Sequence, residues 1–169
     1  MDPKTLEIFD FDWTLFRSPH PPEGIPRKTF LHSPISLEPP HVPARPGSDF
    51  WIEEIVRELR AAQGRRDSIT AVITARRAKT EGRIEELLMQ RRLDPDFLLL
   101  RAVSFQKDKD KVYFKRKSAL EILSQYPTIT KMVVWEDEQE QLASLKDLAR
   151  RRKLEFEGNL VTEPGGLHL

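Results

Sequence analysis

The stretch 6-LEIFDFDWTLF-16 decides the fold, because it ends a short apolar run with two aspartates one residue apart. The run from Thr5 to Asp10 is too short for a helix and long enough for a buried strand. Side chains two positions apart face the same way in a strand, so Asp10 and Asp12 would bring like charges together. Such crowding requires a cation or a shared proton, which makes this strand end a candidate active site.

Strand and helix patterns alternate along the rest of the chain. Strands rich in β-branched residues are predicted at 68–76 and 130–137, with a short extended segment at 96–103 and a last edge strand at 154–163. Helical periodicity is predicted over residues 48–63, 78–92, 115–126 and 138–152, with Ser48 and Asp49 capping the first helix. This alternation predicts an α/β fold, namely a Rossmann-like three-layer sandwich with a mainly parallel central sheet.

One domain is expected over residues 1–169, with its core at about 5–157. Residues 17–48 hold most of the prolines, and we call them the Pro-rich insert. Prolines exclude a regular helix or a central strand, so the insert is predicted to be a long loop that leaves directly from the aspartates. A loop of this length is either functional or disordered. The prolines also argue against a helical cap, and a capless or minimally capped domain is expected.

Composition excludes several classes of function. Lys and Arg number 28 against 27 Asp and Glu, so the formal charge of +1 gives no global field that would attract nucleic acid or an anionic membrane. Any basic recognition surface must be local; residues 106–117 are one candidate, with a solvated loop as the alternative. The absence of cysteine excludes disulfides, thiolate metal sites and a cysteine nucleophile. No secretory signal or membrane span is visible, so a soluble intracellular protein is expected, in the cytoplasm or the nucleus.

Polar residues at three predicted strand ends form the candidate site, namely Asp10 and Asp12, then Thr74, then Glu136 and Asp137. Ligands bind beyond the carboxyl ends of the strands in parallel sheets, so these side chains are expected to meet. Four carboxylates without cysteine or clustered histidine favour Mg²⁺ over zinc. A carboxylate beside such a cation can attack phosphorus while a second carboxyl protonates the leaving oxygen. A lysine of 114-FKRKSAL-120 and the Thr74 hydroxyl would assist phosphoryl transfer.

Four ordered motifs resemble those of the haloacid dehalogenase (HAD)-like hydrolases. The first is 10-DFDWT-14 at a strand end, and the second is Thr74 at the end of an apolar strand. The third is a lysine, matched by Lys115 in preference to Lys117, and the fourth is the acidic pair that ends 133-VVWED-137. The resemblance covers roughly residues 6–149 and implies a HAD-like fold for nearly the whole chain.

This resemblance implies a role for each matched residue. Asp10 would be the nucleophile and Asp12 the general acid and base, while Thr74 would bind the phosphoryl group. Lys115 would neutralise charge on the nucleophile and the phosphate. Further substrate contacts are expected from Arg76 and Lys117. The implied ligands of Mg²⁺ are Asp10, Asp12 through its backbone carbonyl, Glu136 and Asp137.

Finer features resemble one subgroup, the HAD-type domain called Swiss Army Knife RNA repair-like. They include 9-FDFDWTLFRSP-19, 112-VYFKRKSALEIL-123 and 133-VVWEDE-138. That subgroup is similar to the phosphatase module of polynucleotide kinase-phosphatases. The resemblance therefore implies a Mg²⁺-dependent phosphohydrolase that acts through an aspartyl-phosphate on phosphorylated RNA or DNA ends, in a repair role.

Two other functions fit the same motifs. One is a phosphatase of small molecules or phosphoproteins, and the other is a catalytically degenerate module that binds RNA or a protein partner. Glu136 replaces the usual first Asp of the fourth motif, and Glu138 stands where the repair phosphatases often have Arg. These departures bear on the substrate and the metal geometry. Glu138 itself is interpreted as an acid in the first turn of a helix.

Overall fold

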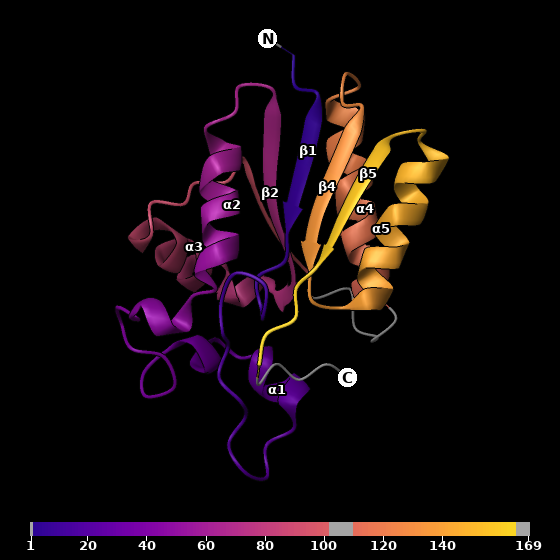
Figure 1. Cartoon of the computed structure of the whole chain (residues 1–169). Helices are drawn as coiled ribbons and strands as arrows, with labels where there is room; N and C mark the ends of the chain where they lie inside the picture. Colours follow the sequence, from indigo (N-terminus) through magenta and orange to yellow (C-terminus); the bar gives the residue numbers. More distant parts are fainter. Residues whose placement is uncertain (1, 102–109, 165–169) are drawn as a thin grey trace.

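The computed structural model describes residues 2–101 and 110–164, which contain one sheet of five parallel strands in the order β3-β2-β1-β4-β5. The strands are β1 (Thr5–Phe9), β2 (Ser68–Arg77), β3 (Phe97–Arg101), β4 (Lys131–Glu136) and β5 (Glu155–Leu160). All five end at the same edge of the sheet (Figure 1). The predicted α/β class, the parallel sheet and the edge position of the last strand are confirmed.

Four helices cover the sheet and complete the three layers. They are α2 (Glu53–Gln63), α3 (Glu81–Gln90), α4 (Asp110–Gln125) and α5 (Gln139–Arg151). The alternating side chains of β1 divide the core, because Phe9 packs in one apolar cluster with α2 and α3 while Leu6 and Ile8 pack in another with α4 and α5. Figure 1 shows α2 on the near side of the sheet and α4 behind it.

The helix predicted over residues 48–63 starts later than expected, and the predicted cap is wrong. Ser48–Phe50 form a separate 3₁₀ turn, and α2 begins only at Glu53. Trp51 between them is extended, bridges to Phe16 and lies edge-on to its ring at 4.9 Å. The Trp51 side chain is 1% exposed, so burying this large aromatic surface outweighs the local capping signal of Ser48 and Asp49.

The Pro-rich insert is not the plain loop that the prolines predicted. It contains a short helix, α1 (Arg27–Leu31), and a 3₁₀ turn at Pro34–Leu37. Pro26 directly precedes α1 and Pro34 opens the turn, positions where a proline needs no amide hydrogen bond and has a suitable φ. α1 lies beyond the carboxyl ends of the strands (Figure 1). The expectation of a minimal cap agrees with this single turn and a half of helix.

Arg83 attaches the insert to α3 through hydrogen bonds. Arg83 on α3 donates hydrogen bonds to the carbonyl oxygens of Leu37 at 2.9 Å, Pro43 at 2.9 Å and Ala44 at 3.2 Å. Leu37 ends the 3₁₀ turn, and the other two carbonyls belong to irregular backbone, so the guanidinium supplies partners that no helix or strand provides.

The remaining elements match the sequence pattern, but their ends are shifted. α4 begins at Asp110, five residues before the predicted start at 115. The predicted extended segment 96–103 corresponds to β3, which covers Phe97–Arg101. Residues 102–103, and 106–109 of the basic segment, lie outside the described residues. Within the described ranges, none of the helices combines the length and the apolar character that a bilayer crossing requires.

Candidate active site

Adjacent strands β2, β1 and β4 bring the predicted site residues together. Phe9 pairs with Val72 of β2 and with Trp135 of β4, so Asp10 emerges between these two neighbours. A cavity of about 420 Å³ opens at this edge, and its lining includes Asp10, Asp12, Thr74, Arg76, Lys115 and Asp137. The prediction that the strand ends converge on one site agrees with this geometry.

A tight turn after β1 directs both aspartates into the cavity. The amides of Leu15 and Phe16 each donate to the Phe11 carbonyl at 3.0 Å, and Trp13 adopts a positive φ of 57°. Phe11 is fully buried and stacks on Phe16 at 5.3 Å. Because Phe11 is anchored in the core, the residues on either side of it face the opposite way, toward the cavity.

Lys115 joins two of the acids. Its Nζ donates to Asp10 Oδ1 and to Glu136 Oε2, both at 2.6 Å, and its side chain is 2% exposed. Burial opposes the charge of this lysine, but the two carboxylates outweigh burial and hold its pKa well above the usual range. The structure thus places Lys115, and not Lys117, in the site.

Lys117 points away from the site because side chains two positions apart on a helix are rotated by roughly 200° from each other. Its side chain is exposed and lies 3.9 Å from Glu121 on the outer face of α4. Lys117 does not line the cavity, so the predicted substrate contact has no support in the geometry.

Three carboxylates crowd at the floor of the cavity. One oxygen each from Asp10, Glu136 and Asp137 lies within 4.8 Å of the others. Burial, followed by the charge of Glu136, raises the pKa of Asp10 to about 7. Burial, followed by the charges of Asp10 and Glu136, raises the pKa of Asp137 to about 10. The site therefore resists full ionisation unless a cation joins it, and an all-oxygen donor set fits Mg²⁺.

Glu136 accepts more hydrogen bonds than Asp10, whose Oδ1 accepts from Lys115 at 2.6 Å and whose Oδ2 accepts from the Thr14 hydroxyl at 3.5 Å. In Glu136, Oε2 accepts from Lys115, and Oε1 accepts the backbone N–H groups of Asp137 at 3.0 Å and Glu138 at 3.2 Å. Glu136 is thus better placed to hold Lys115 than to bind a metal ion directly.

Asp12 lies outside this cluster and is bound by Arg76. Arg76 donates to the Asp12 carboxylate from Nε at 2.9 Å and from Nη2 at 2.7 Å, and the Ser18 hydroxyl donates to it as well. Burial raises the pKa of Asp12, but the charge and hydrogen bonds of Arg76 outweigh burial and lower it below its usual range. In the free protein Asp12 therefore favours the ionised form, whereas Asp10 and Asp137 resist ionisation.

Arg76 also holds the insert. Its Nη1 donates to the Leu31 carbonyl at 2.9 Å and to Ser36 Oγ at 2.7 Å, and the residue is 2% exposed. Sequence reasoning assigned Arg76 a substrate contact and missed these bonds, since nothing local links it to residues 40 or more positions away. One guanidinium thus fixes Asp12 relative to α1.

Thr74 ends the regular pairing of β2 with β3. The register shifts between Thr74 and Arg77, and the Arg76 amide donates to Thr74 Oγ1 at 3.2 Å. Such an irregularity redirects side chains near a site. Thr74 is 1% exposed and lines the cavity, so its hydroxyl proton can be donated to a ligand there.

Glu138 also lines the cavity, a role that its interpretation as a first-turn acid missed. It accepts from Lys111 Nζ at 2.7 and 3.0 Å and from Gln141 Nε2 at 2.8 Å. Glu138 directly precedes α5, and Gln141 follows it by three residues, a spacing that was visible in the sequence. The Lys111 contact, in contrast, depends on how α4 packs on α5.

Residues 31–163 match the family described as HAD domain family 1 in Swiss Army Knife RNA repair proteins. This match covers more than half of the chain, so the protein belongs to that family. The matched residues include Thr74, Lys115 and Asp137, whereas Asp10 and Asp12 precede them. No curated protein matches the chain.

Solved structures share the fold. A chain of the Pnkp1/Rnl/Hen1 RNA repair complex has a TM-score of 0.62 at 15% identity, over 96% of this chain and 44% of that chain. The HAD domain of the Legionella pneumophila effector Lem4 has a TM-score of 0.60 at 11% identity, over 98% and 90% of the two chains. The Legionella pneumophila effector Ceg4 has a TM-score of 0.55 at 13% identity, over 99% and 90%. These likenesses confirm the HAD-like fold, and the chain spans less than half of the repair-complex chain.

Proposed function

We propose that the protein is a Mg²⁺-dependent phosphohydrolase that acts through an aspartyl-phosphate at Asp10 on phosphorylated nucleic-acid ends, RNA foremost. The observation that carries this proposal is the setting of Asp10, whose Oδ1 accepts from the buried Lys115 at 2.6 Å on the floor of a cavity. Lys115 favours the ionised carboxylate, which is the nucleophilic form.

Three ligands would hold the ion, namely the Asp10 carboxylate, the Asp12 backbone carbonyl and the Asp137 carboxylate. The bound ion would supply positive charge to the phosphoryl oxygens during transfer. Thr74 would donate its hydroxyl to one of those oxygens, and Lys115 would stabilise the negative charge shared by nucleophile and phosphate. Glu136 would keep the Lys115 ammonium in place.

Two displacements complete the reaction. In the first, an Asp10 oxygen bonds to phosphorus, the bond from phosphorus to the leaving oxygen breaks, and that oxygen takes a proton from Asp12, which has to carry this proton in the substrate complex although Arg76 favours its carboxylate form in the free protein. In the second, water gives a proton to Asp12 and bonds to phosphorus, and the bond between phosphorus and Asp10 breaks. Inorganic phosphate leaves and both aspartates return to their starting state.

Nucleic-acid ends are the proposed substrate class for two reasons. The family is described by its occurrence in RNA repair proteins, and a chain of an RNA repair complex shares the fold. α1 is the short helix beyond the strand ends, so a minimal cap leaves room for a macromolecular end. Small molecules and phosphoproteins are the competing substrates.

A substrate panel tests the proposal. The full chain is assayed with and without Mg²⁺ on p-nitrophenyl phosphate, 3′- and 5′-phosphorylated oligonucleotides, sugar phosphates and phosphopeptides. We expect Mg²⁺-dependent release of phosphate, fastest on an oligonucleotide. Asp10→Asn should abolish turnover, while Asp94→Asn, an exposed acid at the opposite edge of the sheet, should not change it.

Quenching a reaction with ³²P-labelled substrate should leave label on the wild-type protein and none on Asp10→Asn. Turnover confined to sugar phosphates would refute the nucleic-acid substrate. A folded wild type without turnover on every substrate would refute the enzyme and leave a binding module.

A further inference from the structure

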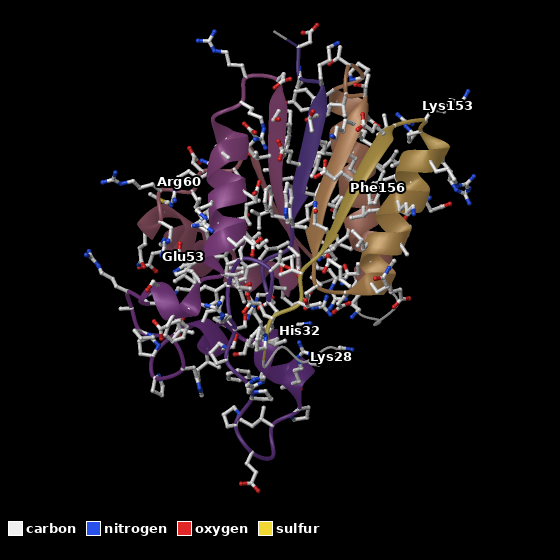
Figure 2. All side chains as sticks on the ribbon, viewed as in Figure 1. Lys28, His32, Glu53, Arg60, Lys153 and Phe156 are labelled. Carbon is white, nitrogen blue, oxygen red and sulfur yellow. The ribbon has the colours of Figure 1, made fainter. Side chains whose placement is uncertain are left out.

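Basic residues of the α1 region and of the end of β3 line the same cavity as the acids. Arg27, Lys28 and His32 of the α1 region and Arg101 at the end of β3 all line the cavity. We call these four residues the basic wall. Figure 2 shows Lys28 and His32 beside α1, beyond the ends of the strands. The chain as a whole carries only +1, so this wall is a local concentration of positive charge.

Hydrogen bonds fix the wall relative to the catalytic acids. Arg101 Nη2 lies 3.2 Å from His32 Nε2, which joins the end of β3 to the end of α1. The Arg76 guanidinium binds the Leu31 carbonyl at the end of α1 and the Asp12 carboxylate at the same time. A ligand that reaches from the acids to the wall therefore meets groups at a set separation.

The pKa of His32 reflects the positive electrostatic potential around it. Burial, followed by the charges of Arg101, Arg77, Lys28 and Arg76, lowers its pKa to about 4. A neutral ring among four cations marks a region where an added anion would be favoured.

We propose that Arg27, Lys28 and Arg101 form a second-anion subsite that binds the phosphodiester next to the terminal phosphate of a nucleic-acid substrate. This inference rests on the proposed function and assigns its specificity to the basic wall. Cations that bind phosphate position a strand without reading its bases. The subsite thus selects an end with a neighbouring phosphate, whatever its sequence.

The chemistry of a nucleic-acid strand favours this occupant over the alternatives. Every linkage in the strand carries a phosphate, so an anion always follows the terminal group at a regular spacing. A sugar monophosphate has no second anion, and a phosphopeptide has one only where an acidic residue happens to follow. A cavity of about 420 Å³ is within the range that holds a small ligand, which suits a terminal nucleotide.

Two substrates of equal shape test the subsite. One is a dinucleotide with a terminal phosphate, at whichever end the substrate panel shows to be cleaved; the other is the same molecule with a neutral methylphosphonate linkage. The wild type should cleave the charged dinucleotide about tenfold more efficiently, mainly through a lower KM. Arg27→Gln combined with Lys28→Gln should remove most of this preference.

Lys146→Gln, which removes an exposed lysine on α5 that does not line the cavity, is the matched control and should keep the preference. Equal cleavage of the two dinucleotides by the wild type, or an unchanged preference in the double variant, would overturn the subsite. If the protein turns over none of the substrates, the proposed enzymatic function is refuted, but the subsite is tested separately. Equilibrium binding of the two fluorescently labelled dinucleotides then decides the subsite, and equal affinities would refute it.

Discussion

The ammonium of Lys115 lies 2.6 Å from a carboxylate oxygen of Asp10, although 105 positions separate the two residues in the chain. The same ammonium binds Glu136, so one cation from α4 ties the ends of β1 and β4 together. Taking these charges out of water costs free energy, and their mutual contacts offset that cost only while all partners are present. The site is therefore sensitive to the loss of any one of them.

Lys115→Met should remove phosphohydrolase activity and lower the free energy of unfolding at pH 8 by about 3–5 kcal/mol, because it leaves buried carboxylates without their cation. Lys117→Met, the matched change two residues along α4, should alter stability by no more than about 0.5 kcal/mol. Urea unfolding measures both. Equal losses in the two variants would show that the position of Lys115 in the site is wrong.

Mg²⁺ should stabilise the protein more at pH 8 than at pH 5.5. Burial and neighbouring acids raise the pKa of Asp10 to about 7, so the folded protein retains a proton that the unfolded chain releases near 4. The contribution of Asp10 to stability without metal is thus greatest at low pH and is lost as pH rises through about 7, where a bound cation offsets the repulsion. Thermal unfolding with and without MgCl₂ measures the shift in Tm. Asp10→Asn should remove most of this shift, and a shift equal at both pH values would contradict the mechanism.

Local patterns were enough to predict the fold and the convergence of the acids. Short β-branched runs alternate with helical periodicity, and parallel strands that follow such a pattern place their carboxyl ends together. Asp10, Thr74 and Asp137 could therefore be assigned to one site from the sequence alone. The preference for Lys115 over Lys117 came from the motif, and helix geometry gives it a physical reason.

Other features depend on contacts that a linear pattern does not contain. Arg76 binds Asp12 and Ser36, which lie 64 and 40 positions away, so its role as a link could not be read from its neighbours. The prolines predicted an insert without a regular helix, yet a proline just before or at a first turn is compatible with the short α1. The late start of α2 depends on the burial of Trp51 against Phe16.

Arg76→Gln should weaken the attachment of α1 as well as the site. The change leaves the Asp12 carboxylate buried without its cation and breaks the bonds to Leu31 and Ser36. We expect faster trypsin cleavage after Arg27 and Lys28, measured by mass spectrometry of timed digests. Ser36→Ala removes the hydrogen bond accepted from Arg76 and the one donated to the Ser33 carbonyl, so it should cost about 0.5–1.5 kcal/mol per bond and accelerate cleavage less. Unchanged cleavage in Arg76→Gln would refute the link.

Asp12→Asn should affect the two displacements of the reaction differently, depending on whether the leaving group needs a proton. A p-nitrophenolate ion leaves without a proton, whereas the alkoxide of a nucleotide end requires one, so the variant should lose about 10²–10⁴-fold on the oligonucleotide in the first step. On p-nitrophenyl phosphate the first step should persist while the water step slows, which predicts a burst of about one p-nitrophenol per protein in stopped-flow absorbance. Asp12 lies outside the carboxylate cluster, so Mg²⁺ should still raise Tm in this variant. Equal loss on both substrates in the first step would show that Asp12 is not the proton donor.

His32 should stay neutral between pH 5.5 and pH 8 and gain a proton only near pH 4, because burial and the surrounding cations lower its pKa. The unfolded chain takes up this proton near pH 6.5, so the contribution of His32 to stability falls as pH drops from about 6.5 to 4. Ring-proton NMR over this range, with the resonance assigned by His32→Gln, measures the titration.

Lys28→Gln should raise the pKa of His32, and so should inorganic phosphate bound at the basic wall, since each reduces the local positive charge. Lys146→Gln should leave it unchanged, and a titration near pH 6.5 in the wild type would show that the cations do not act on His32 as the structure places them.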